Sequence, residues 1–251
     1  MFENIMIDIT DVHTHFGPCC VFDTNVQEEE LINALNKYNV KEAVVQLFPG
    51  IIDFKKYNDE LIEILEKNKD RLFGLISINP HITEKEFNSE VKRLMDTGLF
   101  KAIKLHTIGH SINPLLADSE KIYKAAEKYN IPVMVHTGPG IPFALPSMIR
   151  PAAKKYKNIN FILAHAGGSQ IYSPDAVFVA SDFENVFLET SWTSIDDKKW
   201  FINALGSEKV LFGSDVPGNL PVELFQYDLL NLNKDDLENI LSKNAKRLLG
   251  I

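Results

Sequence analysis

A short apolar segment recurs about every thirty residues along this chain of 251 residues, and a helix-like stretch follows each one. The eight segments span residues 5–15, 42–47, 72–78, 102–106, 132–136, 160–165, 186–191 and 209–215. Their β-branched and aromatic residues are typical of buried strands. Eight strand–helix units in about 250 residues predict an α/β fold, a single (β/α)8 TIM barrel over residues 1–251. An open doubly wound sheet is the alternative, but the even spacing and the lack of a Gly-x-Gly-x-x-Gly motif after the first segment disfavour it.

Helix boundary signals support this alternation. Thr83 and Glu86 have the spacing of a capping box, in which a threonine and a glutamate cap the first turn of a helix reciprocally. Asn25 with Glu28 predicts a similar helix start, and residues 234–249 predict one last continuous helix.

Composition narrows the set of partners and compartments. The chain has 26 basic and 34 acidic residues, a formal net charge of −8, so it lacks the positive footprint expected of a nucleic-acid binder. Its apolar runs are too short to span a bilayer, and no basic region precedes an apolar one near Met1. The adjacent Cys19 and Cys20 build no disulfide framework. We therefore expect a cytoplasmic protein that acts on a small molecule, without a nucleic-acid or membrane partner.

Polar side chains close several of the predicted strands, where a barrel carries its catalytic groups. They include His13, His15, His136, His165 and Asp215. Residues two apart on a strand point to the same face, so His13 and His15 can bind one ion. Three histidines and a carboxylate suit a borderline-soft divalent metal, with zinc as the first expectation and an open position for water. Taken singly, each residue is equally well explained as a hydrogen-bonded histidine or a helix-capping aspartate.

Four further residues are candidates for binding substrate or orienting a ligand: Lys104, His106, Glu189 and Trp192. Lys104 shares a strand face with His106, and a lysine that points into a barrel is costly unless it is paired or modified. It could be carboxylated and bridge two metals, pair with Glu189, or reach solvent at the rim. Glu189 could also orient a metal ligand. Trp192 lies near the mouth, where it either packs or contacts substrate.

Six motifs, in this order, resemble those of the amidohydrolase superfamily. They lie at residues 11–15, 98–106, 133–138, 161–168, 212–217 and 244–249. Within the superfamily, the chain is similar to the amidohydrolase-related (family 2) metal-dependent hydrolases that include the aminocarboxymuconate-semialdehyde decarboxylase-like proteins. This resemblance covers the chain from end to end, and it implies both the barrel fold and a metal-dependent activity.

The resemblance also implies roles for individual residues. His13, His15, His136 and Asp215 would hold one divalent ion, with Zn²⁺ as the first expectation and Mn²⁺ or Fe²⁺ as alternatives. His165 corresponds to the strand-six histidine, which polarises the substrate in mononuclear members and binds a second metal in binuclear ones. Lys104 falls on the strand that carries a carboxylated lysine in some binuclear members. In the subfamily that this chain resembles, the lysine is usually unmodified, so one metal is expected.

The expected chemistry is hydrolysis of a C–O or C–N acyl bond in an amide, lactone or ester. A zinc-type ion lowers the pKa of a bound water from 15.7 to about 7. Asp215 would take the proton of the water, and His165 would stabilise the oxyanion. The alternative is decarboxylation of a small unsaturated or aromatic acid. A phosphodiesterase or nuclease and a non-catalytic metal-binding barrel are less favoured. Barrels of this kind often form homodimers, although no feature of the sequence marks an interface.

Overall fold

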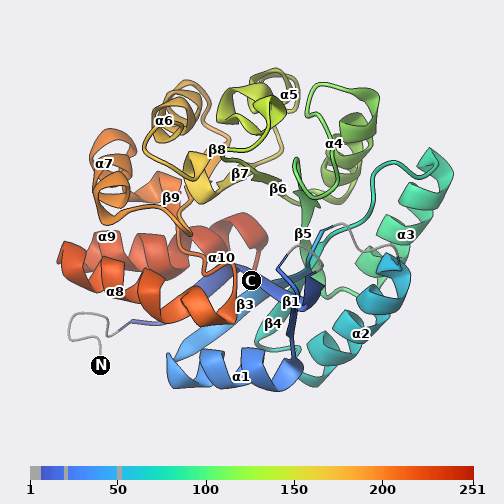
Figure 1. The fold of residues 1–251 in the computed structure, drawn as a ribbon, viewed down its shortest axis with the longest axis horizontal. Coiled ribbons are helices and arrows are strands. Elements are labelled where there is room, and N and C mark those ends of the chain that lie inside the picture. The colour runs from blue at the N-terminus through green and yellow to red at the C-terminus, as the bar shows by residue number, and fades with distance from the viewer. Residues whose placement is uncertain (1–6, 20–21, 50–52) are drawn as a thin grey trace.

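The computed structural model describes residues 7–19, 22–49 and 53–251, which form a curled sheet surrounded by helices (Figure 1). The strands are β1 (Ile9–Cys19), β2 (Thr24–Val26), β3 (Val40–Leu47), β4 (Leu72–Ile76), β5 (Phe100–Leu105), β6 (Val133–His136), β7 (Phe161–Ala164), β8 (Val186–Glu189) and β9 (Val210–Leu211). The helices are α1 (Glu28–Lys37), α2 (Phe54–Lys67), α3 (Glu84–Asp96), α4 (Ala117–Tyr129), α5 (Arg150–Lys155), α6 (Ser173–Asp182), α7 (Ile195–Leu205), α8 (Leu220–Leu230), α9 (Lys234–Glu238) and α10 (Asn244–Leu249).

The strand order is β2-β1-β3-β4-β5-β6-β7-β8-β9. All neighbouring pairs are parallel except β1 and β2, which form an antiparallel pair. Each predicted strand segment contains or overlaps one of the eight parallel strands, so the predicted α/β fold with a parallel sheet is confirmed. The parallel strands follow one another in chain order, whereas a doubly wound sheet reverses its order at a switch point. The doubly wound topology of the alternative is therefore wrong.

Backbone hydrogen bonds join β1 to the segment that follows β9. The amide of Val12 donates to the carbonyl of Phe212 at 3.2 Å, and the amides of Ser214 and Asp215 donate to the carbonyl of His13 at 3.1 and 2.6 Å. The first and the last parallel strands of the chain thus lie against each other.

Two apolar clusters pack on the two sides of the sheet. The larger one fills the space between strands and helices, as expected when each helix buries one face. The smaller one contains residues of every parallel strand and of α10: Val12, Val44, Leu75, Ala102, Met134, Ile162, Ala164, Phe187, Leu211, Ala245, Leu248 and Leu249. This inner cluster lies below the polar residues at the carboxyl ends of the strands and supports them from beneath.

The structure corrects two expectations about helix boundaries. Asn25 does not start a helix, because residues 24–26 still pair with β1 and the N-cap of α1 is Gln27. The predicted helix over 234–249 is divided by a π-helical turn at Asn239–Lys243. In that turn the carbonyl of Ile240 accepts a hydrogen bond from the amide of Phe212, just after β9. The capping box of Thr83 and Glu86 is confirmed at the start of α3.

Within the described residues, none of the helices combines the length and the apolar character needed to cross a membrane. Of the two cysteines, Cys19 is buried at the end of β1 with a free thiol, and Cys20 lies outside the described residues.

Candidate metal centre

Two histidines of β1 converge on one carboxylate oxygen at the carboxyl end of the sheet. The Nε2 atoms of His13 and His15 lie 3.2 and 3.3 Å from the same Oδ1 of Asp215, which follows β9. A register shift between Asp11 and Thr14 interrupts the pairing of β1 with β3. Such bulges change the direction in which a strand presents its side chains, and they occur often beside functional sites. The structure therefore brings these three predicted ligands together.

Glu189 at the end of β8 fixes the orientation of His13. The Nδ1 of His13 donates to Oε2 of Glu189 at 2.8 Å, and the amide of Ser191 donates to Oε1 at 2.6 Å. Gly213 makes this arrangement possible, because a Cβ there would lie 2.6 Å from the glutamate and 2.9 Å from the Cβ of His13. With its Nδ1 proton committed to Glu189, His13 presents the lone pair of Nε2 to the centre of the site.

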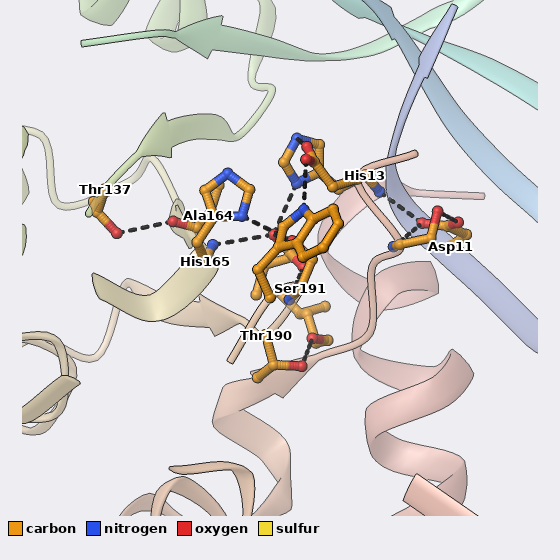
Figure 2. Close-up of polar contacts among 12 residues, drawn as sticks. Asp11, His13, Thr137, Ala164, His165, Thr190 and Ser191 are labelled. Atoms are coloured by element: carbon orange, nitrogen blue, oxygen red, sulfur yellow. Dashed lines mark hydrogen bonds and ion pairs between the residues drawn. The ribbon is translucent and has the colours of Figure 1, made fainter. Parts of the chain in front are cut away.

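His165 directly follows β7 and belongs to the same network (Figure 2). Its amide donates to Oε2 of Glu189 at 3.2 Å, and its Nδ1 lies 2.9 Å from Oγ of Ser191. The hydroxyl of Ser191 gives its single proton to Glu189 at 3.0 Å, so it accepts from Nδ1 of His165. This tautomer leaves the Nε2 of His165 unprotonated. Neutral His165 is therefore a proton acceptor or a ligand at Nε2, not a donor.

Lys104 of β5 is buried, with 1% of its surface exposed, and its Nζ lies 3.0 Å from Nε2 of His13. Burial lowers the pKa of the ammonium to about 8, against the opposing effect of Asp215 and Glu189. The alternative of a lysine that reaches solvent at the rim is wrong. Among the described residues Lys104 makes no close ion pair with Glu189, which acts on its charge from a longer distance, and its nearest polar contact is with His13.

His136 and His106 lie beside this centre but outside its closest groups. The ring of His136, at the end of β6, is 4.8 Å from that of His165 and stacks on His106 at 4.2 Å. The Nδ1 of His136 is buried and has no hydrogen-bond partner, whereas Nδ1 of His106 accepts from the amide of Gly109. Among the described residues, two groups place three potential ligand atoms within 4.8 Å of one another, and neither includes His136. They are His13 with His15 and Asp215, and His13 with His165 and Glu189.

Trp192 contacts the candidate metal ligand Asp215 directly. Its indole Nε1 donates to Oδ2 of Asp215 at 2.7 Å, while 55% of the residue is exposed. The carboxylate is therefore divided in function, with Oδ1 facing the two histidines and Oδ2 held by the indole. Trp200 lies away from this contact, on α7 beside Phe201.

The sequence analysis missed two further supports of the site. Gln46, at the end of β3, places its Nε2 3.0 Å from Nε2 of His15, and its Oε1 is buried without a partner. Asp11 accepts the amides of His13 and Ser214 and the hydroxyl of Ser214, and so ties the two ligand-bearing segments together. Both residues occur in segments that were singled out, one as a polar strand end and one in the first motif, but their partners are not visible in sequence.

The titratable groups have the charge states that a divalent cation requires. Burial lowers the pKa of His13 well below its usual value, and it also lowers the pKa of His15 and His165, so all three rings are neutral. Burial alone would raise the pKa of Asp215, but the adjacent His13, His15 and His165 hold it well below its usual value. The site thus combines neutral imidazoles with an ionised carboxylate.

The distances between the potential ligand atoms also fit a bound metal ion. Nε2 of His13 and Oδ1 of Asp215 are both acceptors in these charge states, and two acceptors 3.2 Å apart repel unless positive charge lies near both; the Lys104 ammonium lies near Nε2, and a divalent ion between the two atoms would meet the same need. Ligands held at roughly 2.0–2.1 Å from a tetrahedral ion are about 3.3–3.4 Å apart, close to the separations found here. The residues of the centre therefore suit a divalent metal.

Comparisons with known proteins show which family this chain is related to. The sequence model of the amidohydrolase family matches residues 11–251. A 2-amino-3-carboxymuconate-6-semialdehyde decarboxylase of Dictyostelium discoideum is 23% identical, over 91% of this chain and 78% of that protein.

Solved structures share the fold at low sequence identity. The structure of 5-carboxyvanillate decarboxylase from Novosphingobium aromaticivorans, in complex with manganese and 4-hydroxy-3-methoxy-5-nitrobenzoic acid, is similar with a TM-score of 0.78 at 14% identity, covering 100% of this chain and 98% of that one. A probable 2-pyrone-4,6-dicarboxylic acid hydrolase from Acinetobacter baumannii is similar with a TM-score of 0.73 at 16% identity, covering 98% and 100%. Because the family match extends over nearly the whole sequence, the resemblance seen in the motifs is confirmed, and this chain is an enzyme of the amidohydrolase family.

Proposed function

We propose that this chain is a divalent-metal-dependent hydrolase that attacks a C–O or C–N acyl bond of a small amide, lactone or ester. The observation that carries the proposal is the convergence of His13 and His15 on one oxygen of Asp215, while Trp192 holds the other oxygen. The proposed metal ligands are His13, His15, His136 and Asp215. The proposed reacting groups are Asp215 and His165.

The proposal includes a complete (β/α)8 barrel formed as one domain over residues 1–251. The hydrogen bonds between β1 and the segment after β9 support closure of the sheet. The inner cluster supports it as well, because every parallel strand contributes a side chain, as in the filled interior of such a barrel. A closed barrel would place all eight strand ends around one mouth.

The residues of the site have complementary tasks. When bound, a divalent ion polarises a carbonyl oxygen and lowers the pKa of water. Asp215 can take the proton of the attacking water on Oδ2, which keeps a second lone pair beside the indole N–H. Asp215 would then pass this proton to the leaving group, while Nε2 of His165, left unprotonated because Ser191 holds the Nδ1 proton, can accept a hydrogen bond from the attacking water or the substrate. Buried Lys104 keeps positive charge close to His13.

Metal analysis tests the proposal directly. Protein purified without added metal is expected to contain about one zinc ion per chain, with Mn²⁺ or Fe²⁺ as alternatives. His13→Ala should lose the ion, whereas His81→Ala, a histidine that pairs with Asp118 away from the centre, should keep it. Two ions per chain would instead support a carboxylated Lys104 as a bridging ligand. No ion after incubation with zinc or manganese would overturn the metal-dependent function.

A second candidate is decarboxylation of a small unsaturated or aromatic acid. Two similar proteins support it, because the Dictyostelium relative and the Novosphingobium protein are both decarboxylases. Assays of the metal-loaded protein separate the two reactions, because hydrolysis releases a new acid or amine and decarboxylation releases carbon dioxide. Carbon dioxide release from aromatic or unsaturated acids, without turnover of lactones, esters or amides, would replace the first proposal with the second. The acidic net charge of −8 supports a small-molecule substrate over a phosphodiester polymer in either case.

A further inference from the structure

A buried ion pair that has no part in the proposed reaction lies directly behind Trp192. Lys198 of α7 and Glu223 of α8 are 0% and 1% exposed, and Nζ of the lysine is 3.0 Å from Oε2 of the glutamate. The ammonium also donates to the carbonyl of Thr193 at 2.8 Å and to Oε1 of Gln226 at 2.9 Å. Burying two charges is costly unless their remaining hydrogen bonds are satisfied. The ammonium is fully paired, whereas Oε2 of Glu223 makes the ion pair but no hydrogen bond, so the pair offsets the charge of a carboxylate whose hydrogen bonds are all made by its other oxygen.

The other oxygen of Glu223, Oε1, connects the ion pair to the turns that carry Trp192 and Asp215. Oε1 accepts the backbone amide of Trp192 at 2.7 Å and Nδ2 of Asn219 at 3.0 Å. The second proton on Nδ2 of Asn219 is donated to the carbonyl of Ser214 at 3.0 Å, directly before Asp215. Glu223 therefore holds both of the turns that follow β8 and β9.

The indole closes this arrangement into a ring of contacts. Glu223 binds the amide of Trp192, the indole of Trp192 binds Oδ2 of Asp215, and the backbone before Asp215 returns through Asn219 to Glu223. Trp192 has a φ of +63°, a left-handed conformation that bulky residues rarely adopt. Neighbouring bonds also hold this turn, among them the amide of Thr193 on the carbonyl of Thr190, but the bond to Glu223 is the one that the amide of Trp192 itself makes.

We propose that Glu223, neutralised by Lys198, is a positioning residue that acts through Trp192 on Asp215. It keeps the indole N–H on Oδ2, so that Oδ1 stays directed at His13 and His15. More than half of Trp192 is exposed, so water competes for this hydrogen bond, and a fixed backbone is what keeps the indole in place. The inference rests on the proposed metal function for its consequence, but the contact itself exists without a metal.

The first test is a double-mutant cycle on metal affinity. Zn²⁺ or Mn²⁺ is titrated calorimetrically into the metal-free full chain. Trp192→Phe, which removes the N–H but keeps an aromatic ring, should raise the Kd about 10- to 100-fold, the range found when an outer partner of a metal ligand is lost. Glu223→Leu, which removes the acceptor for the amide of Trp192, should change it in the same direction. The double variant should equal Trp192→Phe alone, because the effect of Glu223 passes through the indole. Multiplicative effects would overturn the proposal.

A second pair of variants guards against simple misfolding. Glu223→Leu alone also leaves Lys198 buried without a counterion. In a Lys198→Met background neither replacement at position 223 leaves an unpaired charge, and Glu223→Gln keeps an oxygen for the amide of Trp192 whereas Glu223→Leu does not. The glutamine version should bind metal more than tenfold tighter than the leucine version. Equal affinities would contradict a positioning role.

Fluorescence reads the contact without any metal. The chain has two tryptophans, so Trp200→Phe leaves Trp192 as the single emitter. In that background, with Lys198→Met, Glu223→Leu should shift the metal-free emission to the red relative to Glu223→Gln, because only the leucine releases the amide of Trp192 and with it the indole. Glu90→Gln, which weakens the buried carboxylate contact to Arg93 on α3, should leave emission and Kd unchanged. Equal emission of the glutamine and leucine versions would overturn the inference. Absence of metal binding by the wild-type chain would overturn the proposed function alone.

Discussion

Three residues of the site adopt a backbone conformation that disfavours their side chains. His165, Trp192 and Asp215 have φ values of +66°, +63° and +66°, each at the turn after a different strand. Such a conformation costs about 1–3 kcal/mol per residue and persists only where the surroundings enforce it. Here each strained amide donates a hydrogen bond within or beside the site, to Glu189, Glu223 and the carbonyl of His13 respectively. The strain is thus concentrated where side chains must be directed inward.

The role of Asp215 can be tested at the level of this one residue. Asp215→Asn keeps the side-chain shape and the backbone bond to His13, so the fold and the melting temperature should change little. It removes the negative charge and the proton acceptor, so turnover of the substrate found by screening should fall by about 10²- to 10⁴-fold. Steady-state kinetics with metal-saturated protein, together with a thermal melt, check both parts. A variant with full activity would exclude Asp215 from the reaction.

At the level of elements, a helix boundary was predicted correctly where all the interacting atoms lie within one helical turn. The capping box at the start of α3 is formed by Thr83 and Glu86 as expected, with the glutamate amide 3.3 Å from Oγ1 of Thr83. The start signal at Asn25 failed because β2 pairs with β1, a contact between segments that no helix signal encodes. Pairing between strands overrode a local preference there.

The capping box also supports a prediction about stability. Thr83→Ala should lower the free energy of unfolding by about 1 kcal/mol, because it leaves the helix N-terminus without its side-chain acceptor. Thr83→Ser keeps a hydroxyl and should lose much less. Urea denaturation of the three proteins measures the difference. Since α3 contributes none of the groups that bind His13 or Asp215, metal content should be the same in all of them, and a change in it would show that α3 also shapes the site.

At the scale of the whole molecule, buried neutral histidines make the fold sensitive to acid. Burial lowers the pKa of His110 from 6.5 to about 4, and its Nδ1 has no partner among the described residues. At a pH between these two pKa values, His110 is protonated in the unfolded chain and neutral in the folded chain. The free energy of unfolding therefore falls as the pH falls through this window, by about 2 kcal/mol at pH 5 from this one group.

His110→Leu should remove this contribution. Urea denaturation of the metal-free protein at pH 7.5 and pH 5 should show a smaller loss of stability in the variant than in the wild type, by about 2 kcal/mol. The remaining loss belongs to the other buried histidines, whose pKa values are lowered by burial as well. An equal loss in both proteins would mean that His110 is not held neutral in the fold.

The sequence alone was enough to predict the positions of the parallel strands. A buried parallel strand must be a short apolar run, and a helix must cross over before the next one, so the pattern is written locally and repeats along the chain. The same pattern showed which polar residues stand at the carboxyl ends, and the spacing along β1 placed His13 and His15 on one face. Asp215 lies beside them because the sheet is curled and the segment after β9 binds β1.

The hydrogen bonds that orient those residues became visible only in the folded structure. Glu189 binds His13 across 176 residues, Gln46 binds His15 across 31, and Glu223 binds the amide of Trp192 across 31. Whether Lys104 meets a carboxylate, solvent or His13 depended on where β5 stands relative to β1 in the curled sheet. Such contacts depend on how the strands and helices pack against one another. Packing angles leave no periodic pattern in the sequence, whereas the position of each strand does. The partners of a side chain on another strand are therefore much harder to predict than the strand itself.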